Sequence, residues 1–294
     1  MLRDYIDQHG VAGLVPKRKL PLTNDLINAM LSVHDGAARD GLMVDRLSYY
    51  WIAMLAVFTV LAESGERKDE VPRFTFSDLT WKVGGAQYKV LTPVLRARLR
   101  VGDGVYYAHG VAKNDPVGAY FAATPTFLPW RATGRCACRA LADLEAAADV
   151  PAARRASTPL YGPSVGQRFT PPQIDAAFKL LLSRGAGLPD TEIVNYSVHS
   201  FRIFLACALL AANCPRWLIK RMLRWRGDES LEIYSRVSDH EWSSRLSDSL
   251  GVCVDASLVP RMPKIDLSDE QQSAFLHMAH SLLGADIAGS ANLA

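Results

Sequence analysis

Residues 197–202 read Ser-Val-His-Ser-Phe-Arg and place His199 and Arg202 three positions apart at the predicted start of a helix. Residues i and i+3 lie on one face of a helix, so the two side chains project together within its first turn. Unpaired backbone N–H groups and the positive end of the helix dipole already favour an anion there. The box therefore indicates a phosphate site, while a capped helix with a solvated arginine is the plainer interpretation of these residues alone.

Two other parts of the chain carry side chains suited to the same chemistry. Residues 65–70 read Gly-Glu-Arg-Lys-Asp-Glu, a G-x-R-x-x-E pattern that contains Arg67 and follows a long apolar run. Trp225 and Tyr234 follow the histidine of the first box by 26 and 35 residues. Taken singly, each is also compatible with ordinary packing, because charged junctions between helices and strands are common and a tyrosine on a short helix is usually a packed aromatic.

Apolar residues at helical spacing predict helices along most of the chain. Thr23 is a typical N-cap for the first of them, and Gly65 is a typical stop for the run that begins at Tyr49. Ser268 and Gln271 form a capping box at the start of the last one. The helices are expected over residues 23–33, 49–62, 136–148, 171–185, 197–212, 215–225, 228–237 and 268–283.

Residues 71–130 have a different residue pattern, which predicts a small antiparallel sheet. The expected strands are runs that alternate or are rich in β-branched and aromatic residues: 73–76, 95–101, 105–108 and 119–122. Lys113 begins a Lys-Asn-Asp-Pro turn between the last two runs. The fold class that follows is α+β, mainly α-helical, with a small antiparallel sheet on one side.

Composition limits the kind of protein rather than its activity. Of 294 residues 49% are apolar and 21% charged, and the net charge is only +3, so total charge does not by itself indicate a nucleic-acid partner. Five cysteines include one C-x-C pair, Cys136 and Cys138, without the second pair that zinc sites usually need. The longest apolar run, 49–62, is shorter than the about 20 residues that span a bilayer. These features favour an intracellular protein, nuclear or cytoplasmic, with no membrane segment and no metal.

In their order along the chain, the candidate residues resemble the catalytic motifs of tyrosine recombinases, also called phage-type integrases. Members of that family carry an arginine in G-x-R-x-x-E after a long apolar helix, a lysine in a β-hairpin turn, an H-x-x-R box, a histidine or tryptophan, and then a nucleophilic tyrosine. The tryptophan and its spacings are similar to those of Cre. The residues around the H-x-x-R box and around the tryptophan, 197–202 and 223–226, are similar to those of recombinases of eukaryotic mobile elements. The matching positions in this sequence are Arg67, Lys113, His199, Arg202, Trp225 and Tyr234.

The resemblance implies the catalytic fold of that family and site-specific DNA recombination or integration, with DNA cleaved and rejoined through a 3′-phosphotyrosine on Tyr234. Arg67 and Arg202 would clamp the phosphate, where preorganised cations stabilise the negative charge of the transition state. His199 and Trp225 would donate hydrogen bonds to it, and the histidine would assist removal of the tyrosine proton. The covalent bond conserves the phosphodiester energy, so no ATP, metal or other cofactor is expected.

Two of these roles have rivals in the sequence. Lys113 would protonate the departing 5′-oxygen, and its turn between two strand candidates favours it. Lys82 and Lys89 could replace it, because hairpin registers are hard to determine from one sequence. Tyr196 is the alternative to Tyr234, although its place just before the first box fits a packing role.

Basic residues near the site are expected to contact double-stranded DNA. On the 215–225 helix three of them recur at every fourth position and would form one stripe suited to phosphates, although an ordinary solvated face has the same spacing. Three more stand together near the beginning of the chain. The residues expected to bind DNA are Lys17, Arg18, Lys19, Arg216, Lys220 and Arg224.

The domain organisation also follows from the resemblance. Recombinases of the family usually have a helical core-binding domain before the catalytic one, and residues 1–19 would be a remnant of the linker to that missing domain. Residues 20–240 would form the catalytic domain. Residues 241–294 would form a C-terminal tail whose amphipathic helix, 268–283, either docks on a neighbouring subunit, giving a homo-tetramer on DNA, or packs on its own domain.

Two other functions fit parts of the pattern. An enzyme like type IB topoisomerases would nick and reseal DNA by the same chemistry without exchanging strands. A domesticated, catalytically silent relic of a mobile-element recombinase would bind DNA only; the missing core-binding domain favours it, and the presence of all six catalytic residue types opposes it. A covalent DNA adduct separates the enzymes from the relic, and strand exchange separates the two enzymes.

Overall fold

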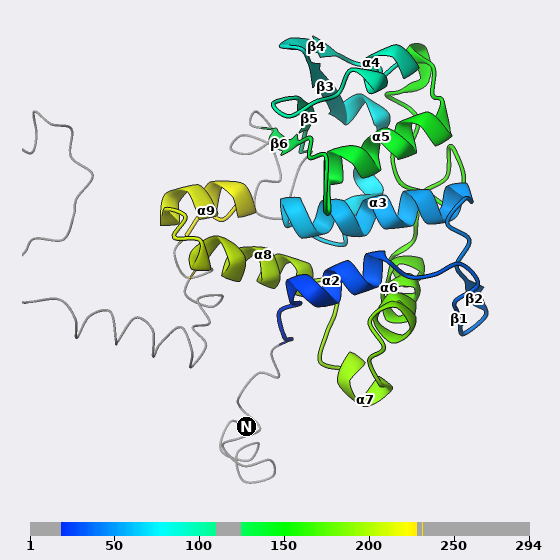
Figure 1. Ribbon diagram of the computed structural model, residues 1–294, viewed down its shortest axis with the longest axis vertical. Coiled ribbons are helices and arrows are strands. Elements are labelled where there is room, and N and C mark those ends of the chain that lie inside the picture. Colours follow the sequence, from blue (N-terminus) through cyan, green and yellow to red (C-terminus); the bar gives the residue numbers. More distant parts are fainter. Residues whose placement is uncertain (1–18, 110–124, 228–230, 232–294) are drawn as a thin grey trace, which may run out of the picture. The chain divides into compact units, whose positions relative to one another are not determined.

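The computed structural model describes residues 19–109, 125–227 and 231. The chain divides into two compact units, residues 1–236 and 237–294, and every described residue belongs to the first. The predicted fold class is confirmed in that part of the chain: the architecture is α+β and mainly helical, with a four-stranded antiparallel sheet and a two-stranded ribbon (Figure 1).

The bounds of the elements are as follows. The α-helices are α2 (Asn24–Leu31), α3 (Tyr49–Ser64), α4 (Pro93–Ala97), α5 (Ala137–Ala148), α6 (Pro171–Leu180), α7 (Asp190–Ile193), α8 (Ser200–Ala211) and α9 (Arg216–Leu223). The strands are β1 (Ala38–Arg39), β2 (Leu42–Met43), β3 (Leu79–Val83), β4 (Ala86–Tyr88), β5 (Gly104–Tyr107) and β6 (Thr126–Pro129). Three 3-10 turns are η1 (Val71–Arg73), η2 (Phe76–Asp78) and η3 (Ala152–Arg154), and η4 (Leu181–Gly185) is a π-helical turn. None of the helices described here is both long and apolar enough to cross a membrane.

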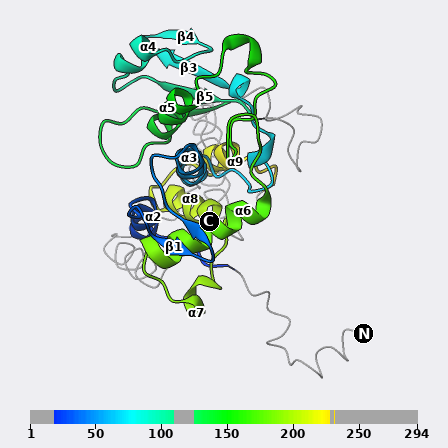
Figure 2. The ribbon, with the colours of Figure 1, turned by 90° about the vertical axis from the view of Figure 1, so that its right-hand side faces the viewer.

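Helix α3 is the central element. It is apolar nearly all the way round, which is typical of a helix covered on every side, and Trp51, Phe58 and Leu61 are almost completely buried. In both ribbon views α3 lies between the layer of the sheet and α5 and the layer of α2 and α8 (Figure 1 and Figure 2). Gly65 follows its last turn with a left-handed backbone, φ 62°, which is the stop that the sequence predicts.

The four-stranded sheet has the order β4-β3-β5-β6, and every neighbouring pair is antiparallel. Trp81, Val105 and Leu128 stand side by side on β3, β5 and β6 and turn into the core, where each is at most 1% exposed. Strands β5 and β6 pair with each other, and Lys113 belongs to the stretch of sequence between them. This lysine and the predicted strand 119–122 lie outside the described residues.

Two of the predicted strands are wrong. Residues 95–101 lie in α4 and the turn after it, because Thr92 caps this helix and Pro93 occupies its first position. Arg96, Arg98 and Arg100 alternate in that run and would have shared one face of the predicted strand; in α4 and the turn after it they do not. Residues 73–76 lie between and within two 3-10 turns, and their backbone pairs with the segment around Thr158 instead of joining the sheet.

The expected helices 228–237 and 268–283 and the tail 241–294 fall on residues outside the description, apart from Leu231. Helix α9 is two residues shorter than predicted at its end, and this difference decides the place of Arg224 in the site below.

Gly65→Ala is expected to lower the free energy of unfolding by about 2–4 kcal/mol, because a left-handed alanine costs about 1 kcal/mol and overpacking adds about 1–3 kcal/mol. A Cβ at this position would lie 2.5 Å from Leu223 Cδ2 and 3.2 Å from Leu205 Cδ2. The measurement is urea unfolding of the two proteins.

Gly41→Ala is the matched control. Gly41 also has a left-handed backbone, φ 80°, but a Cβ there would meet nothing within 4 Å. Its loss should be about 1 kcal/mol, from the backbone alone. Equal losses in the two variants would contradict the close packing of α9 on the end of α3.

Candidate active site

Four segments that are distant in the sequence meet beside the end of α3. They are the loop after α3, the start of α8, the end of α9 and the end of β5. The predicted residues Arg67, His199 and Arg202 are neighbours there, and Trp225 joins them. We call the ionisable side chains of this place the charged cluster: Glu66, Arg67, Glu70, His109, His199, Arg202 and Arg224.

Arg202 is the buried centre of the charged cluster. It is 1% exposed, and its guanidinium donates to two backbone carbonyls, from Nη1 to Gly65 and from Nη2 to Leu223. The ring of Trp225 lies against the guanidinium, with 5.3 Å between the ring centroid and Cζ. Burial first, and then the positive charge of Arg67, lowers the pKa of Arg202 to about 9. Arg202 is therefore still a cation at neutral pH.

Arg67 is the most accessible of the three arginines, with 23% of its side chain exposed. Glu70 holds it at two points: Oε1 accepts from Nη1 at 2.8 Å, and Oε2 accepts from the backbone N–H at 3.1 Å. Burial by itself raises the pKa of Glu70, but a hydrogen bond with Glu66 and the charge of Arg224 outweigh it, and the pKa lies well below its ordinary value. Glu70 is thus a carboxylate that fixes the direction of Arg67.

Arg224 differs from its predicted place on the exposed stripe of α9. The helix ends at Leu223, and Arg224 follows with a left-handed backbone, φ 54°, so its side chain leaves the helical stripe and is buried at 2% exposure. Its Nη2 donates to Glu66 Oε2 at 2.7 Å and to Glu70 Oε2 at 3.1 Å. The prediction assumed that the helix continues through this residue; because it does not, Arg224 pairs inside the protein instead of facing DNA.

His109 is a member of the charged cluster that the sequence did not indicate. It follows β5, is 6% exposed, and its Nδ1 lies 2.7 Å from Glu66 Oε1, an ion-pair distance without the alignment of a hydrogen bond. Its Nε2 lies 2.6 Å from Thr126 Oγ1 on β6 and 3.5 Å from Arg224 Nη1. A lone histidine after a β-rich run has no motif, so only the folded chain reveals its contact with the loop after α3.

His199 is the N-cap residue of α8 and is exposed. Partial desolvation, followed by the positive charges of Arg202 and Arg67, lowers the pKa of this histidine below its ordinary value. Together, His199 and Arg67 are the accessible members of the cluster, while Arg202, Arg224 and the glutamates lie beneath them. The arrangement can present one neutral imidazole and a supported guanidinium to an anion.

The predicted residues Lys17, Arg18, Lys113 and Tyr234 lie outside the described residues. The DNA-contact candidates Arg216 and Lys220 stand on α9 as expected, the first exposed and the second partly buried. Lys19 donates from Nζ to the carbonyl of Val194 at 2.6 Å.

The alternative candidates for the lysine and tyrosine roles have partners in the fold. Lys82 Nζ lies 5.7 Å from the ring centroid of Phe127, and Lys89 Nζ donates to Thr80 Oγ1 at 2.8 Å. Tyr196 packs partly buried against the main hydrophobic core. Its contacts are those of the packing role that the sequence suggests.

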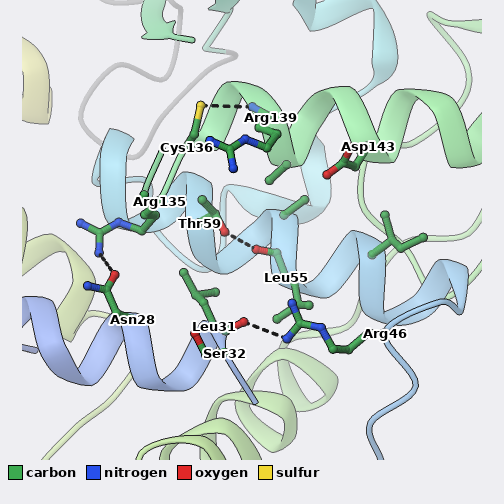
Figure 3. A pocket seen from close by; sticks show the side chains of 14 residues that line it. Asn28, Leu31, Ser32, Arg46, Leu55, Thr59, Arg135, Cys136, Arg139 and Asp143 are labelled. Atoms are coloured by element: carbon green, nitrogen blue, oxygen red, sulfur yellow. Dashed lines mark hydrogen bonds between the residues drawn. The ribbon is translucent and has the colours of Figure 1, made fainter. Parts of the chain in front are cut away.

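A separate pocket of about 590 Å³ lies between α2, α3 and α5 and contains no residue of the charged cluster (Figure 3). Two of the arginines that line it are engaged by the protein: Arg46 donates to the carbonyl of Leu31 at 2.9 Å, and Arg135 donates to the side chain of Asn28 at 3.1 Å. These cations join the helices around the pocket. Across the described residues there is also no group of three or more His, Cys, Asp or Glu side chains placed to hold a metal ion.

Comparison with known proteins finds likenesses among solved structures. No family model matches the chain, and no curated protein sequence matches it either. Among solved structures, the chain is similar to the crystal structure of XerA recombinase, with 14% sequence identity and a TM-score of 0.49. The match covers 79% of this chain and 64% of that one, so it spans less than two thirds of the XerA chain.

Removal of the Arg67 charge is expected to raise the pKa of His199, because the positive charge of Arg67 is one of the causes that lower it. The measurement is an NMR titration of the His199 ring in the Arg67→Gln variant beside the unmodified protein. Lys82→Gln, which removes a cation of the sheet, is the control and should leave the titration where it is. An unchanged His199 titration in Arg67→Gln would contradict the proximity of the two side chains.

Proposed function

We propose that this chain is a tyrosine recombinase that cleaves and rejoins double-stranded DNA through a 3′-phosphotyrosine, with Tyr234 as the nucleophile. The observation that supports it most is the meeting of Arg67, His199, Arg202 and Trp225, which come from three segments of the chain and match the family motifs in order. A chance set of motif residues has no reason to gather at one place in a fold.

The chemistry needs cations beside the scissile phosphate. Attack by a tyrosine hydroxyl builds negative charge on the phosphoryl oxygens, and preorganised donors stabilise that charge more than they stabilise the ground state. Arg67 is accessible and held from behind by Glu70, so its guanidinium is oriented before DNA arrives. Arg202 adds positive charge directly beneath, and each of its terminal nitrogens keeps a second hydrogen beyond the one donated to a carbonyl.

His199 suits the role of proton acceptor. Its lowered pKa keeps the imidazole neutral near pH 7, and a neutral imidazole can accept the proton of an attacking tyrosine. Trp225 packs on Arg202 and keeps water from that side of the guanidinium.

Lys113 is the proposed general acid for the 5′-oxygen. The strands β5 and β6 that flank its segment are paired, and β5 leads directly to His109 inside the charged cluster. The rival Lys82 and Lys89 lie on or next to β3 and β4 and contact partners of the sheet. His109, four residues before Lys113, lies at the site, which favours Lys113 over the other two lysines.

The wider function follows the same proposal. The product would be site-specific recombination or integration of a mobile element, with Arg216 and Lys220 of α9 and the basic residues 17–19 on DNA phosphates. The tail helix 268–283 would join subunits into a tetramer on DNA. Such an enzyme acts where DNA is, in the nucleus or cytoplasm, and needs neither metal nor ATP because the covalent bond retains the phosphodiester energy.

A suicide-substrate assay tests the reaction. The protein is incubated with nicked duplexes taken from its own genomic flanks, and an SDS-resistant protein–DNA adduct is expected. Tyr234→Phe should abolish the adduct, because phenylalanine has no hydroxyl to attack phosphorus. Tyr196→Phe is the matched control and should leave the adduct in place.

The possible outcomes separate the rival functions. An adduct that persists in Tyr234→Phe and disappears in Tyr196→Phe would move the nucleophile. DNA binding without any adduct would favour the DNA-binding relic. An adduct that reseals without exchanging strands between two duplexes would favour the topoisomerase-like activity.

A further inference from the structure

We propose that Arg224 is a positioning residue for the phosphate clamp: it holds Glu66 and Glu70 so that Glu70 presents Arg67 to the scissile phosphate. The inference rests on the proposed function, since it concerns how the same site is kept ready. Arg224 stands next to Trp225 in the sequence, yet it does not share that residue's place on the guanidinium of Arg202.

The backbone of Arg224 is the first observation. Among the described residues, four that are not glycine have a positive φ: Asp40, Asp149, Asn213 and Arg224. Aspartate and asparagine tolerate this conformation because their short side chains bond locally, and glycine is the usual residue at such a helix end. An arginine has neither advantage, so the contacts of its guanidinium must offset the cost of the backbone.

The contacts themselves form a continuous chain of ion pairs. Nη2 of Arg224 donates to Glu66 and Glu70, and Glu70 in turn accepts from the side chain and backbone of Arg67. Both carboxylate oxygens of Glu70 are therefore occupied, which leaves it one orientation. Through Glu66 the chain continues to His109 at the end of β5.

Charge balance explains why an arginine is needed. Glu66 and Glu70 are nearly buried and both accept from Nη2 of Arg224, so without Arg224 two neighbouring carboxylates would lie beside Arg67 without that cation. They would hold its guanidinium more strongly and compete with a phosphate for it. With Arg224 bound to both glutamates, Glu70 still orients the guanidinium of Arg67 but binds it less strongly, so that Arg67 can donate to a phosphate.

The guanidinium of Arg224 is engaged by the two glutamates inside the protein. Arg224 is 2% exposed and its side chain lies behind Glu70, whereas 23% of the Arg67 side chain is exposed. An effect of Arg224 on the reaction would therefore pass through Glu70 and Arg67. This separates a positioning residue from a phosphate contact by measurement, because only a contact changes DNA affinity and its salt dependence.

The test compares Arg224→Lys and Arg224→Gly with Asn213→Gly. Lysine keeps the charge but replaces the rigid, planar guanidinium, whose Nη2 bridges both glutamates, with a flexible ammonium. Glycine keeps the left-handed helix end and loses the side chain. Asn213 is the matched control, since it has the same backbone conformation, φ 55°, and is exposed at the end of α8. Single-turnover cleavage of the suicide substrate is measured for each, together with DNA affinity at two salt concentrations and the melting temperature.

Both Arg224 variants should slow cleavage by about 10–100-fold, the size expected when a clamp is misplaced by an ångström, while DNA affinity and its salt dependence change little. Asn213→Gly should cleave like the unmodified protein. If Arg224→Gly unfolds, Arg224→Lys still decides the matter. Adding Glu66→Gln to Arg224→Gly should restore part of the lost rate, because one unpaired carboxylate is removed.

Three results would overturn the inference. Cleavage of Arg224→Lys at the unmodified rate would show that the network does not position Arg67. A weaker salt dependence of DNA binding would make Arg224 a phosphate contact. If the unmodified protein itself forms no adduct in the same assay, the proposed function fails first and this inference with it, an outcome distinct from the other two.

Discussion

The guanidinium of Arg202 joins the ends of two helices by donating to the carbonyls of Gly65, after α3, and Leu223, in the last turn of α9. Carbonyls at helix C-termini lack partners within the helix and carry the negative end of its dipole, so a buried cation between two of them satisfies both. Because α3 is the centre of the fold, this interaction fixes α8 and α9 against it. Trp225 packs on the same guanidinium, and Arg224 follows Leu223 directly in the chain.

The charged cluster around Arg202 has two layers with different roles. The inner layer, which includes Arg202 and Arg224, balances its charges within the protein and sets the geometry. The outer layer, Arg67 and His199, is accessible, and under the proposed function it would contact the scissile phosphate. Preorganisation of this kind is what electrostatic catalysis requires, because donors that are already fixed need no rearrangement when charge develops.

The sequence predicts this architecture where local patterns decide it and fails where tertiary contacts decide it. Apolar spacing and the Gly65 stop correctly define α3. Of the six motif residues, Arg67, His199, Arg202 and Trp225 lie together, while Lys113 and Tyr234 lie outside the described residues. The strand expected at 95–101 fails because a cap at Thr92 outweighs alternation of side chains. Arg224 is misplaced because regular helical spacing cannot reveal where α9 ends, and the burial of His109 depends on a partner far away in the sequence.

The most direct test of the two-layer account is a crystal structure of the Tyr234→Phe protein bound to a DNA duplex with an intact cleavable phosphate. The account predicts that Arg67 and His199 lie within hydrogen-bond distance of one phosphate, while Arg224 keeps its contacts with Glu66 and Glu70. A phosphate held elsewhere, or Arg224 turned away from the glutamates onto the DNA, would contradict it.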